Sequence, residues 1–331
     1  MTSSPAWRGS GSRRARRSTR LAPSFHLDRR DRRVTTKHAD ELRRAGARNR
    51  RCAGFGRCTG AWLTSLTDRV VTGLARGKPL VVEVHVPLCD NTIIACGNPK
   101  LGDGDNPDTN LYWSTTAGFG EWFGHHGWTR VAKLAAGHTG DADVLAIHVY
   151  SRTVTTPARW RDRGVPAHYT IELVVRAWRG SAIDRALAAY AADVSGVGTR
   201  RVVIGDTTID AGGAAQIVAW VGHNRLMDLD RFAWPAAGKA AKGMIAIACD
   251  TASYMEAEVT APTRVPLLMT RDLLFANAAP LEATVLAFAT GGDYTRMRRD
   301  AAVAYAGVQQ RTVEHVFGAF TNPSDARWKK R

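Results

Sequence analysis

A histidine and a cysteine each follow an apolar segment of strand length in the second half of the chain. Residues 216–221 lead into Gly222 and His223, and residues 243–248 lead into Cys249. Apolar runs of this length, rich in β-branched side chains, predict buried strands. Because neighbouring parallel strands end at the same edge of a sheet, about 4.8 Å apart, we expect the two side chains to lie within interaction distance.

A thiol beside an imidazole can carry out nucleophilic catalysis on an acyl group. The thiolate attacks the carbonyl carbon, and the imidazole takes the thiol proton and later protonates the leaving amine. We therefore predict Cys249 as the nucleophile and His223 as the general base and acid. A helix predicted at residues 251–259 would lower the pKa of the thiol through its N-terminus, whereas the charge of Asp250 would act in the opposite direction.

The turns around these side chains also supply backbone N–H groups. Those of Cys249 and of the turn formed by Gly222 and Asn224 are the predicted oxyanion hole, where one donor contributes about 3 to 4 kcal/mol. Either residue alone could have a purely structural role. A cysteine at the end of a buried strand, such as Cys249, often packs simply as a small hydrophobic side chain. A single histidine at a strand end is likewise often only hydrogen-bonded. The ordered pair, each member after a glycine or an alanine, favours the catalytic interpretation.

The surrounding segments predict an α/β domain. Strands alternate with helices, which is typical of a mainly parallel sheet flanked by helices. The predicted strands are residues 80–86, 144–150, 169–177, 216–221, 243–248 and 265–269, and the predicted helices are residues 61–75, 111–123, 181–193, 251–259, 281–289 and 295–320. The helix at 181–193 is expected to begin with a capping box, with Ser181 as the N-cap and Asp184 at the third helical position.

The charge of the chain is concentrated at its beginning. The 331 residues carry a formal net charge of +16, but residues 1–57 alone hold 17 basic and 4 acidic side chains. This segment has few large apolar residues and no periodicity, so it is predicted to be a disordered basic tail, followed by one domain at residues 58–331. Nucleic acid is not an expected partner, except through the tail, since the run lacks interleaved aromatic residues or a binding fold.

Three aspartates, Asp103, Asp105 and Asp108, lie close together in the segment LGDGDNPDTN. Several carboxylates with glycines between them can bind Ca²⁺, so calcium is a candidate cofactor. Their spacing departs from the EF-hand pattern, and an Asx-rich turn is the preferred interpretation. Otherwise we expect no cofactor.

Five cysteines are spread along the chain, at positions 52, 58, 89, 96 and 249. Their spacing matches no zinc-binding pattern, and a disulfide framework is not expected in a cytosolic protein of this size, so free thiols are predicted. The sequence also contains neither a signal-peptide pattern nor an apolar run of about 18 residues. These features predict a cytoplasmic protein without membrane contact.

The residues Gly222-His223 and Ala248-Cys249 resemble the caspase-like cysteine peptidases, the clan of caspases, metacaspases, legumains and gingipains. Members of that clan end one strand on Gly-His, usually followed by glycine, and the next on cysteine. The resemblance implies a caspase-like sheet, with His223 as general base and Cys249 as nucleophile, although Asn224 stands where the clan has glycine. The segments LCDN, NLYW and VGHN also resemble an uncharacterised bacterial family, which implies no activity.

Together these features predict a caspase-like α/β domain that hydrolyses peptide or amide bonds of a peptide or protein substrate. The alternative from another functional class is a catalytically inactive module of the same fold that serves as a scaffold or interaction protein. The two differ in the reactivity of Cys249, which a scaffold would leave inert.

Overall fold

The computed structural model describes residues 55–260 and 263–330. Nearly all of the predicted basic tail, together with Cys52, therefore lies outside the described residues. Within the described ranges, no helix is long and apolar enough to cross a membrane.

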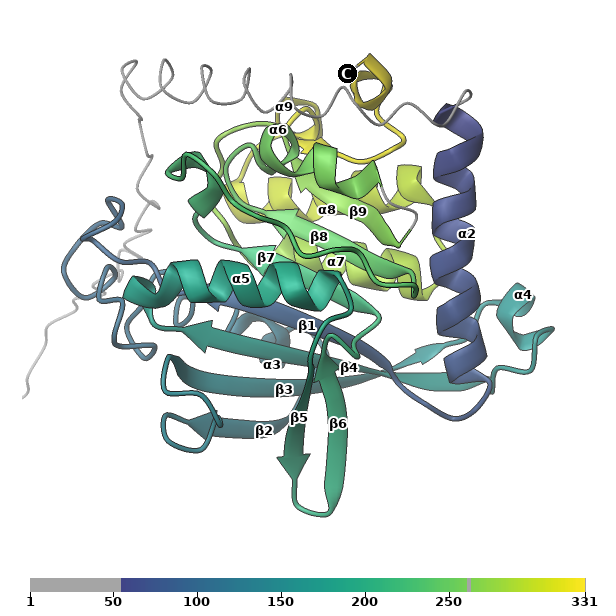
Figure 1. The fold of residues 1–331 in the computed structure, drawn as a ribbon, viewed down its shortest axis with the longest axis horizontal. Helices are drawn as coiled ribbons and strands as arrows, with labels where there is room; N and C mark the ends of the chain where they lie inside the picture. The colour runs from purple at the N-terminus through teal and green to yellow at the C-terminus, as the bar shows by residue number, and fades with distance from the viewer. Residues whose placement is uncertain (1–54, 261–262, 331) are drawn as a thin grey trace, which may run out of the picture.

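The core of the fold is an eight-stranded mixed sheet (Figure 1). Across the sheet the strands are β10 (Phe320–Thr321), β9 (Arg264–Thr270), β8 (Lys242–Ile247), β7 (Ile217–Val221), β1 (Leu80–Pro87), β4 (His168–Trp178), β3 (Val144–Thr155) and β2 (Thr129–Ala135). The five strands from β9 to β4 are mutually parallel, while β10, β3 and β2 pair antiparallel. The prediction of an α/β fold with a mainly parallel sheet flanked by helices is confirmed.

The helices and one hairpin lie against this sheet (Figure 1). The α-helices are α2 (Phe55–Leu74), α3 (Trp122–His125), α4 (Ala158–Arg161), α5 (Ile183–Val194), α6 (Thr251–Met255), α7 (Ala279–Ala289), α8 (Tyr294–Gln309) and α9 (Val313–Phe317). Short 3-10 segments span Gly180–Ala182, Arg225–Met227, Glu256–Thr260 and Ala326–Lys330. The hairpin consists of β5 (Thr199–Ile204) and β6 (Thr207–Gly212).

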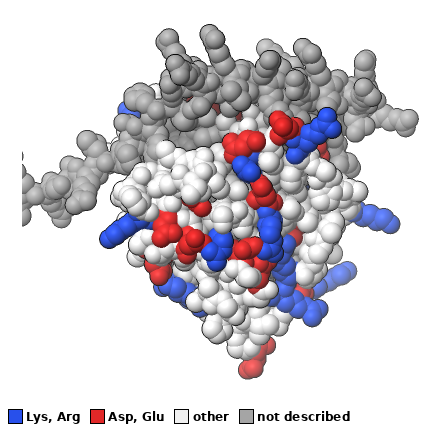
Figure 2. All heavy atoms as spheres, turned by 60° about the vertical axis from the view of Figure 1, so that its left-hand side comes forward, with Lys and Arg blue, Asp and Glu red and all other residues white. Residues whose placement is uncertain are grey.

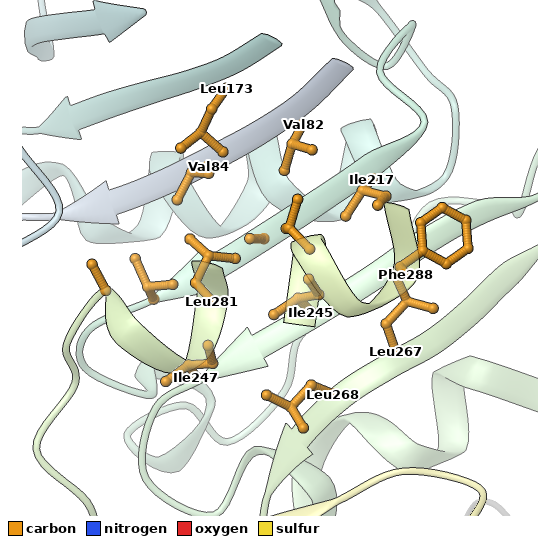
Figure 3. Packing of buried hydrophobic residues seen from close by; sticks show 14 of the residues in the cluster. Val82, Val84, Leu173, Ile217, Ile245, Ile247, Leu267, Leu268, Leu281 and Phe288 are labelled. Carbon is orange, nitrogen blue, oxygen red and sulfur yellow. The ribbon is translucent and has the colours of Figure 1, made fainter. Parts of the chain in front are cut away.

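Alternation along the strands divides the buried residues between the two faces of the sheet, because successive strand side chains point to opposite sides. Val82 and Val84 of β1 belong to one apolar cluster with side chains of α2, α7 and α8. In Figure 3, Leu281 and Phe288 of α7 lie against these strands. Val81 belongs to the opposite cluster, with side chains of α5 and the β5–β6 hairpin. Both faces are therefore covered, as the apolar strand sequences require.

The predicted helix at 111–123 is wrong. The structure forms a series of turns there, and only the short helix α3 follows. Gly118 and Gly120 explain the difference, because a Cβ atom at either position would lie 2.5 Å from Trp113, from its carbonyl oxygen in one case and its indole ring in the other. The glycines permit a close fold of the backbone around Trp113 that a regular helix does not provide.

Two other predicted helix boundaries are also wrong. The capping box at Ser181 and Asp184 does not form, because a 3-10 turn occupies Gly180–Ala182 and α5 begins only at Ile183 without a side-chain cap. The predicted helix at 295–320 is divided into α8, α9 and β10. The division occurs at Gln310, which adopts a left-handed φ of 52° that a continuing helix cannot contain.

A buried lysine on β8 gives the fold an expected pH dependence. Lys242 is 1% exposed, and its ammonium donates to the carbonyl oxygens of Gly213 and Ala215 rather than to a carboxylate. Burial, together with the charge of Arg69, lowers its pKa from 10.5 to about 7. Between these two values the unfolded chain binds a proton that the folded chain does not, so stability rises with pH in this window.

We expect the free energy of unfolding to increase from pH 7 to pH 9, by at most about 1.4 kcal/mol per pH unit from this group. Urea denaturation of the wild type and of Lys242→Met at pH 7, 8 and 9 measures the difference. A rise of the same size in both proteins would show that Lys242 is not its source.

Candidate active site

The two predicted catalytic residues follow neighbouring strands of the sheet. Strands β7 and β8 pair in parallel up to Val221 and Ile247, and the N–H of Gly222 donates to the carbonyl oxygen of Ile247 at 3.2 Å. His223 and Cys249 are thus each two residues beyond the last paired position, at the same edge of the sheet. Strands β1 and β4 end on the left of Figure 1, and this side comes forward in Figure 2, where acidic and basic side chains are interspersed.

Glycine is required at position 222 for two reasons. Its φ of 116° lies in a region that L-residues rarely adopt, and a Cβ atom there would lie 3.3 Å from the ring of Tyr112. The chain can therefore turn directly after the strand and present His223 at its end.

His223 has an acidic partner that the sequence analysis did not identify. Its Nε2 lies 2.6 Å from Oδ2 of Asp228, which also receives a bond from Arg225 at 3.3 Å. Burial acts to raise the pKa of Asp228, but the contacts with His223 and Arg225 outweigh it and hold this pKa below its ordinary value. Asp228 is therefore ionised at neutral pH, and its bond to Nε2 leaves Nδ1 as the nitrogen that can serve the thiol.

Cys249 is half-buried, with Sγ lying 3.7 Å from the carbonyl oxygen of Leu274. Burial raises the pKa of the thiol, and the charges of Asp250 and Asp272 raise it further, while the bond to Leu274 acts in the opposite direction. The N-terminus of the following helix was expected to lower the pKa of the thiol, but this effect is smaller than the others, since α6 has only five residues. The resting thiol is therefore protonated at neutral pH, and its reactivity depends on a base.

No hydrogen bond joins His223 to Cys249 in the part of the chain that the structure describes. The strand ends bring the two residues to one edge, and each makes its own polar contact there. Apo sites often hold catalytic groups in longer contacts than those of the reacting complex.

Asn224 connects the ends of the two strands. It is fully buried, and its Nδ2 donates to the carbonyl oxygen of Cys249 at 2.7 Å. The backbone N–H groups of Asn224 and Cys249 make no hydrogen bond among the described residues, whereas that of Gly222 is used between the strands. Of the predicted oxyanion-hole residues, Cys249 and Asn224 therefore have N–H groups that can donate to a negatively charged oxygen. Gly222 contributes only by allowing the turn after β7.

A small cavity of about 170 Å³ adjoins the thiol's acceptor, Leu274. Its lining combines apolar and polar side chains: Asp272, Leu273, Leu274, Tyr305, Gln309, Arg311, His315, Val316 and Ala319. Neither Cys249 nor His223 is part of this lining, but a space of this size beyond Leu274 can accommodate a side chain of a bound peptide.

The loop after β1 contains a disulfide, which corrects the prediction of free thiols. Cys89 is bonded to Cys96, whereas Cys249 is free, and the side chain of Cys58 lies outside the described ones. The sequence misled because disulfides are rare in the reducing cytosol, the compartment that had been assumed. The loop is tied to the site, since Asn110 binds both backbone polar groups of Cys89 and also accepts from the N–H of Tyr112, whose ring packs on Gly222.

We expect iodoacetamide, applied without reductant to the denatured protein, to leave Cys89 and Cys96 unmodified and to modify Cys249. Peptide mass spectrometry before and after reduction measures this directly. Carbamidomethylation of Cys89 and Cys96 in the unreduced sample would contradict the disulfide.

The three aspartates of the LGDGDNPDTN segment form turns rather than a ligand set. Oδ1 of Asp103 accepts from the N–H of Asp105, and Asp105 pairs with Arg179. The N–H of Asp108 donates to Oδ1 of Asn106. Within the described ranges their carboxylates do not belong to a cluster of potential metal ligands. The Asx-rich turn preferred from the sequence is thus the observed geometry.

One cluster of potential metal ligands does occur within residues 55–260 and 263–330, on the face of the sheet under the β5–β6 hairpin. It consists of Glu83, His85 and Asp193, all buried. The indole N–H of Trp178 donates to Nδ1 of His85 at 3.1 Å, so the proton is on Nε2, which donates to Asp193 at 2.9 Å. Both carboxylates also pair with arginines. Both oxygens of Glu83 and both ring nitrogens of His85 are therefore already hydrogen-bonded, and Oδ1 of Asp193 is the atom of this cluster without a partner. One free oxygen does not make a site for a metal ion.

Comparisons with family models, with curated proteins and with solved structures yield no match to this chain. The functional interpretation therefore rests on the residues and their geometry.

Proposed function

We propose that this chain is a cysteine-dependent hydrolase of peptide or amide bonds. The observation that carries the proposal is the edge formed by β7 and β8, where His223, held by Asp228, and the half-buried thiol of Cys249 follow neighbouring parallel strands. Nucleophile, base and orienting carboxylate are the three parts that such catalysis needs.

In the proposed mechanism, Nδ1 of His223 removes the thiol proton as Cys249 attacks the carbonyl carbon of the substrate. The ionised Asp228 stabilises the resulting imidazolium through Nε2. His223 then donates the proton to the leaving amine, and a water molecule, deprotonated by the same imidazole, hydrolyses the thioester. Because the pKa of the thiol is raised, proton removal belongs to the reaction itself rather than to the resting state.

The backbone N–H groups of Asn224 and Cys249 would donate hydrogen bonds to the substrate oxygen and stabilise the negative charge that develops on it. Neither group has an acceptor among the described residues. The bond from the Asn224 side chain to the Cys249 carbonyl holds the two turns together, which supports a fixed distance between these donors.

The caspase-like relationship belongs to this proposal. It is supported by the order of the Gly-His and Ala-Cys pairs and by their position after adjacent parallel strands. Asn224 departs from the glycine of that clan, and in this chain its buried side chain serves as the link between β7 and β8.

An inert scaffold is the second candidate, and the electrostatics of the thiol favour it. Burial and the neighbouring Asp250 and Asp272 all disfavour the thiolate, and no hydrogen bond from His223 compensates among the described residues. The half-buried position of Cys249 favours the hydrolase instead, since a substrate can reach the sulfur.

The proposal is tested with a library of peptides that carry a fluorogenic amide at the C-terminus. The full chain is expected to release the fluorophore from a subset of the library, and Cys249→Ala is expected to release none. Ser253→Ala, on the adjacent helix α6, is the matched control and should retain activity. Equal rates in the wild type and Cys249→Ala would exclude catalysis by this thiol.

The compartment is also a proposal. The sequence favours the cytoplasm, whereas the Cys89–Cys96 disulfide is of a kind that persists in oxidising surroundings. We therefore favour an oxidising compartment, or an oxidising phase of growth, in which the Cys89–Cys96 disulfide forms.

A further inference from the structure

A second cavity, larger than the one beside Leu274, lies on the opposite face of the sheet, near the end of β4. It has a volume of about 260 Å³ and is lined by Thr139, Gly140, Asp141, Val144, Arg176, Trp178, Arg200 and Arg201. These residues come from the β2–β3 turn, from β3 and β4, and from β5 of the hairpin. No residue of the β7 and β8 ends contributes to the lining.

Three arginines and one aspartate are among the residues that line this cavity. Arg176 is 3% exposed and uses Nε to pair with Glu83, while its buried Nη2 has no hydrogen-bond partner. A buried N–H group without an acceptor is costly, so an acceptor arriving in the cavity would relieve a deficit that the protein alone leaves.

The other two arginines also have donors to spare. Arg200 pairs with Asp193 through Nη1, and its Nε and Nη2 have no acceptor among the described residues. Arg201 lies 3.4 Å from Asp210 in a largely exposed pair, and such pairs are weak enough to exchange for a ligand. A guanidinium presents five N–H donors in a plane, which matches the oxygens of a carboxylate or phosphate.

The single carboxylate in the lining is engaged elsewhere. Asp141 lies 3.2 Å from Arg185, outside the lining, and the deeper carboxylates of Glu83 and Asp193 each face an arginine. The donor inventory therefore favours an anion.

We propose that this cavity is a binding site for a small oxyanion, a phosphate or carboxylate group held by Arg176, Arg200 and Arg201. The inference is independent of the proposed hydrolase, because the two sites share no residue. The ligand is recognised by bidentate hydrogen bonds from arginine, whether its oxygens belong to a phosphoryl group or to an organic acid.

Isothermal titration calorimetry of the full chain with inorganic phosphate, and separately with succinate, tests the proposal. The ionic strength is held constant with chloride, so that general attraction to the basic chain does not contribute. We expect saturable binding of one anion per chain, and affinity at least fivefold lower in Arg201→Gln. Tighter phosphate binding would identify a phosphoryl ligand, and tighter succinate binding a carboxylate.

The matched control is Arg299→Gln, on the exposed side of α8, where the arginine pairs with Asp300 and lies far from the cavity in sequence. It should bind as the wild type does. Arg200→Gln should weaken binding further, and its melting temperature shows whether it is folded, since Arg200 pairs with the buried Asp193. Absence of saturable binding of both anions, or equal affinity in the wild type and Arg201→Gln, would overturn the proposal.

Discussion

Replacing His223 by alanine is expected to lower kcat/KM for any peptide substrate of the wild type by about 10² to 10⁴-fold, the usual contribution of a positioned general base and acid. The effect should be this large because the pKa of the Cys249 thiol is raised by burial and by two acidic neighbours, so no thiolate is available without the base. Hydrolysis of the fluorogenic peptides measures it.

Two further variants make this result specific. Asp228→Asn keeps a hydrogen-bonding group beside Nε2 but removes the charge, and we expect a smaller loss of about tenfold, since Asp228 is partly exposed and screened. His125→Ala, an exposed histidine of α3, should leave the rate unchanged. A His223→Ala protein as active as His125→Ala would contradict the assigned role.

The largest expected effect on stability comes from Glu83. Its side chain is fully buried, pairs with the nearly buried Arg176 and accepts a bond from the N–H of Gly212 at 3.1 Å. Truncation to alanine leaves a buried guanidinium without its counter-charge, and breaking a pair of this kind costs about 3 to 5 kcal/mol. For a domain of this size that corresponds to a fall in melting temperature of about 10 °C.

Thermal unfolding followed by circular dichroism measures this change. The comparison variant is Asp68→Ala, which removes an exposed partner of Arg163 and should alter stability by less than about 1 kcal/mol. The double replacement Glu83→Leu with Arg176→Leu should recover part of the loss, since no charge is left unpaired. A Glu83→Ala protein that melts within two degrees, roughly, of the wild type would mean that the pair does not stabilise the fold.

The parallel strands could be predicted because their signal is local. Residues of β7 are apolar on both faces, and β8 and β1 depart from this only at Lys242, Glu83 and His85. Their length and β-branched content therefore still indicate buried strands. Adjacent carboxyl ends then follow from the topology of such a sheet, which is why His223 and Cys249 could be placed at one edge before the structure was known.

Edge strands and the hairpin gave no comparable signal. In β2 no residue is buried, and only two are half-buried, so it has no apolar pattern to detect. Strands β5 and β6 contain charged and small polar residues, because only a few of their side chains contact the sheet. Their existence depends on pairing with distant residues.

The partners of the site residues were equally hidden. Asp228 follows His223 by five residues, and only the 3-10 turn at Arg225–Met227 brings its carboxylate back to the imidazole. A histidine followed within one turn by an aspartate is a usable signal, although a common one. The disulfide of Cys89 and Cys96 was missed because the compartment was assumed before the geometry of the loop was known.

The most direct test of the central claim, that His223 activates Cys249, is the rate of alkylation of Cys249 by iodoacetamide from pH 6 to pH 10. Peptide mass spectrometry separates Cys249 from the other cysteines, and the wild type is compared with His223→Ala. We expect the wild type to react at least tenfold faster at pH 7.5, and the variant to react appreciably only above the ordinary thiol pKa, because burial raises this pKa. Identical pH profiles in the two proteins would contradict a functional pair and favour the inert scaffold.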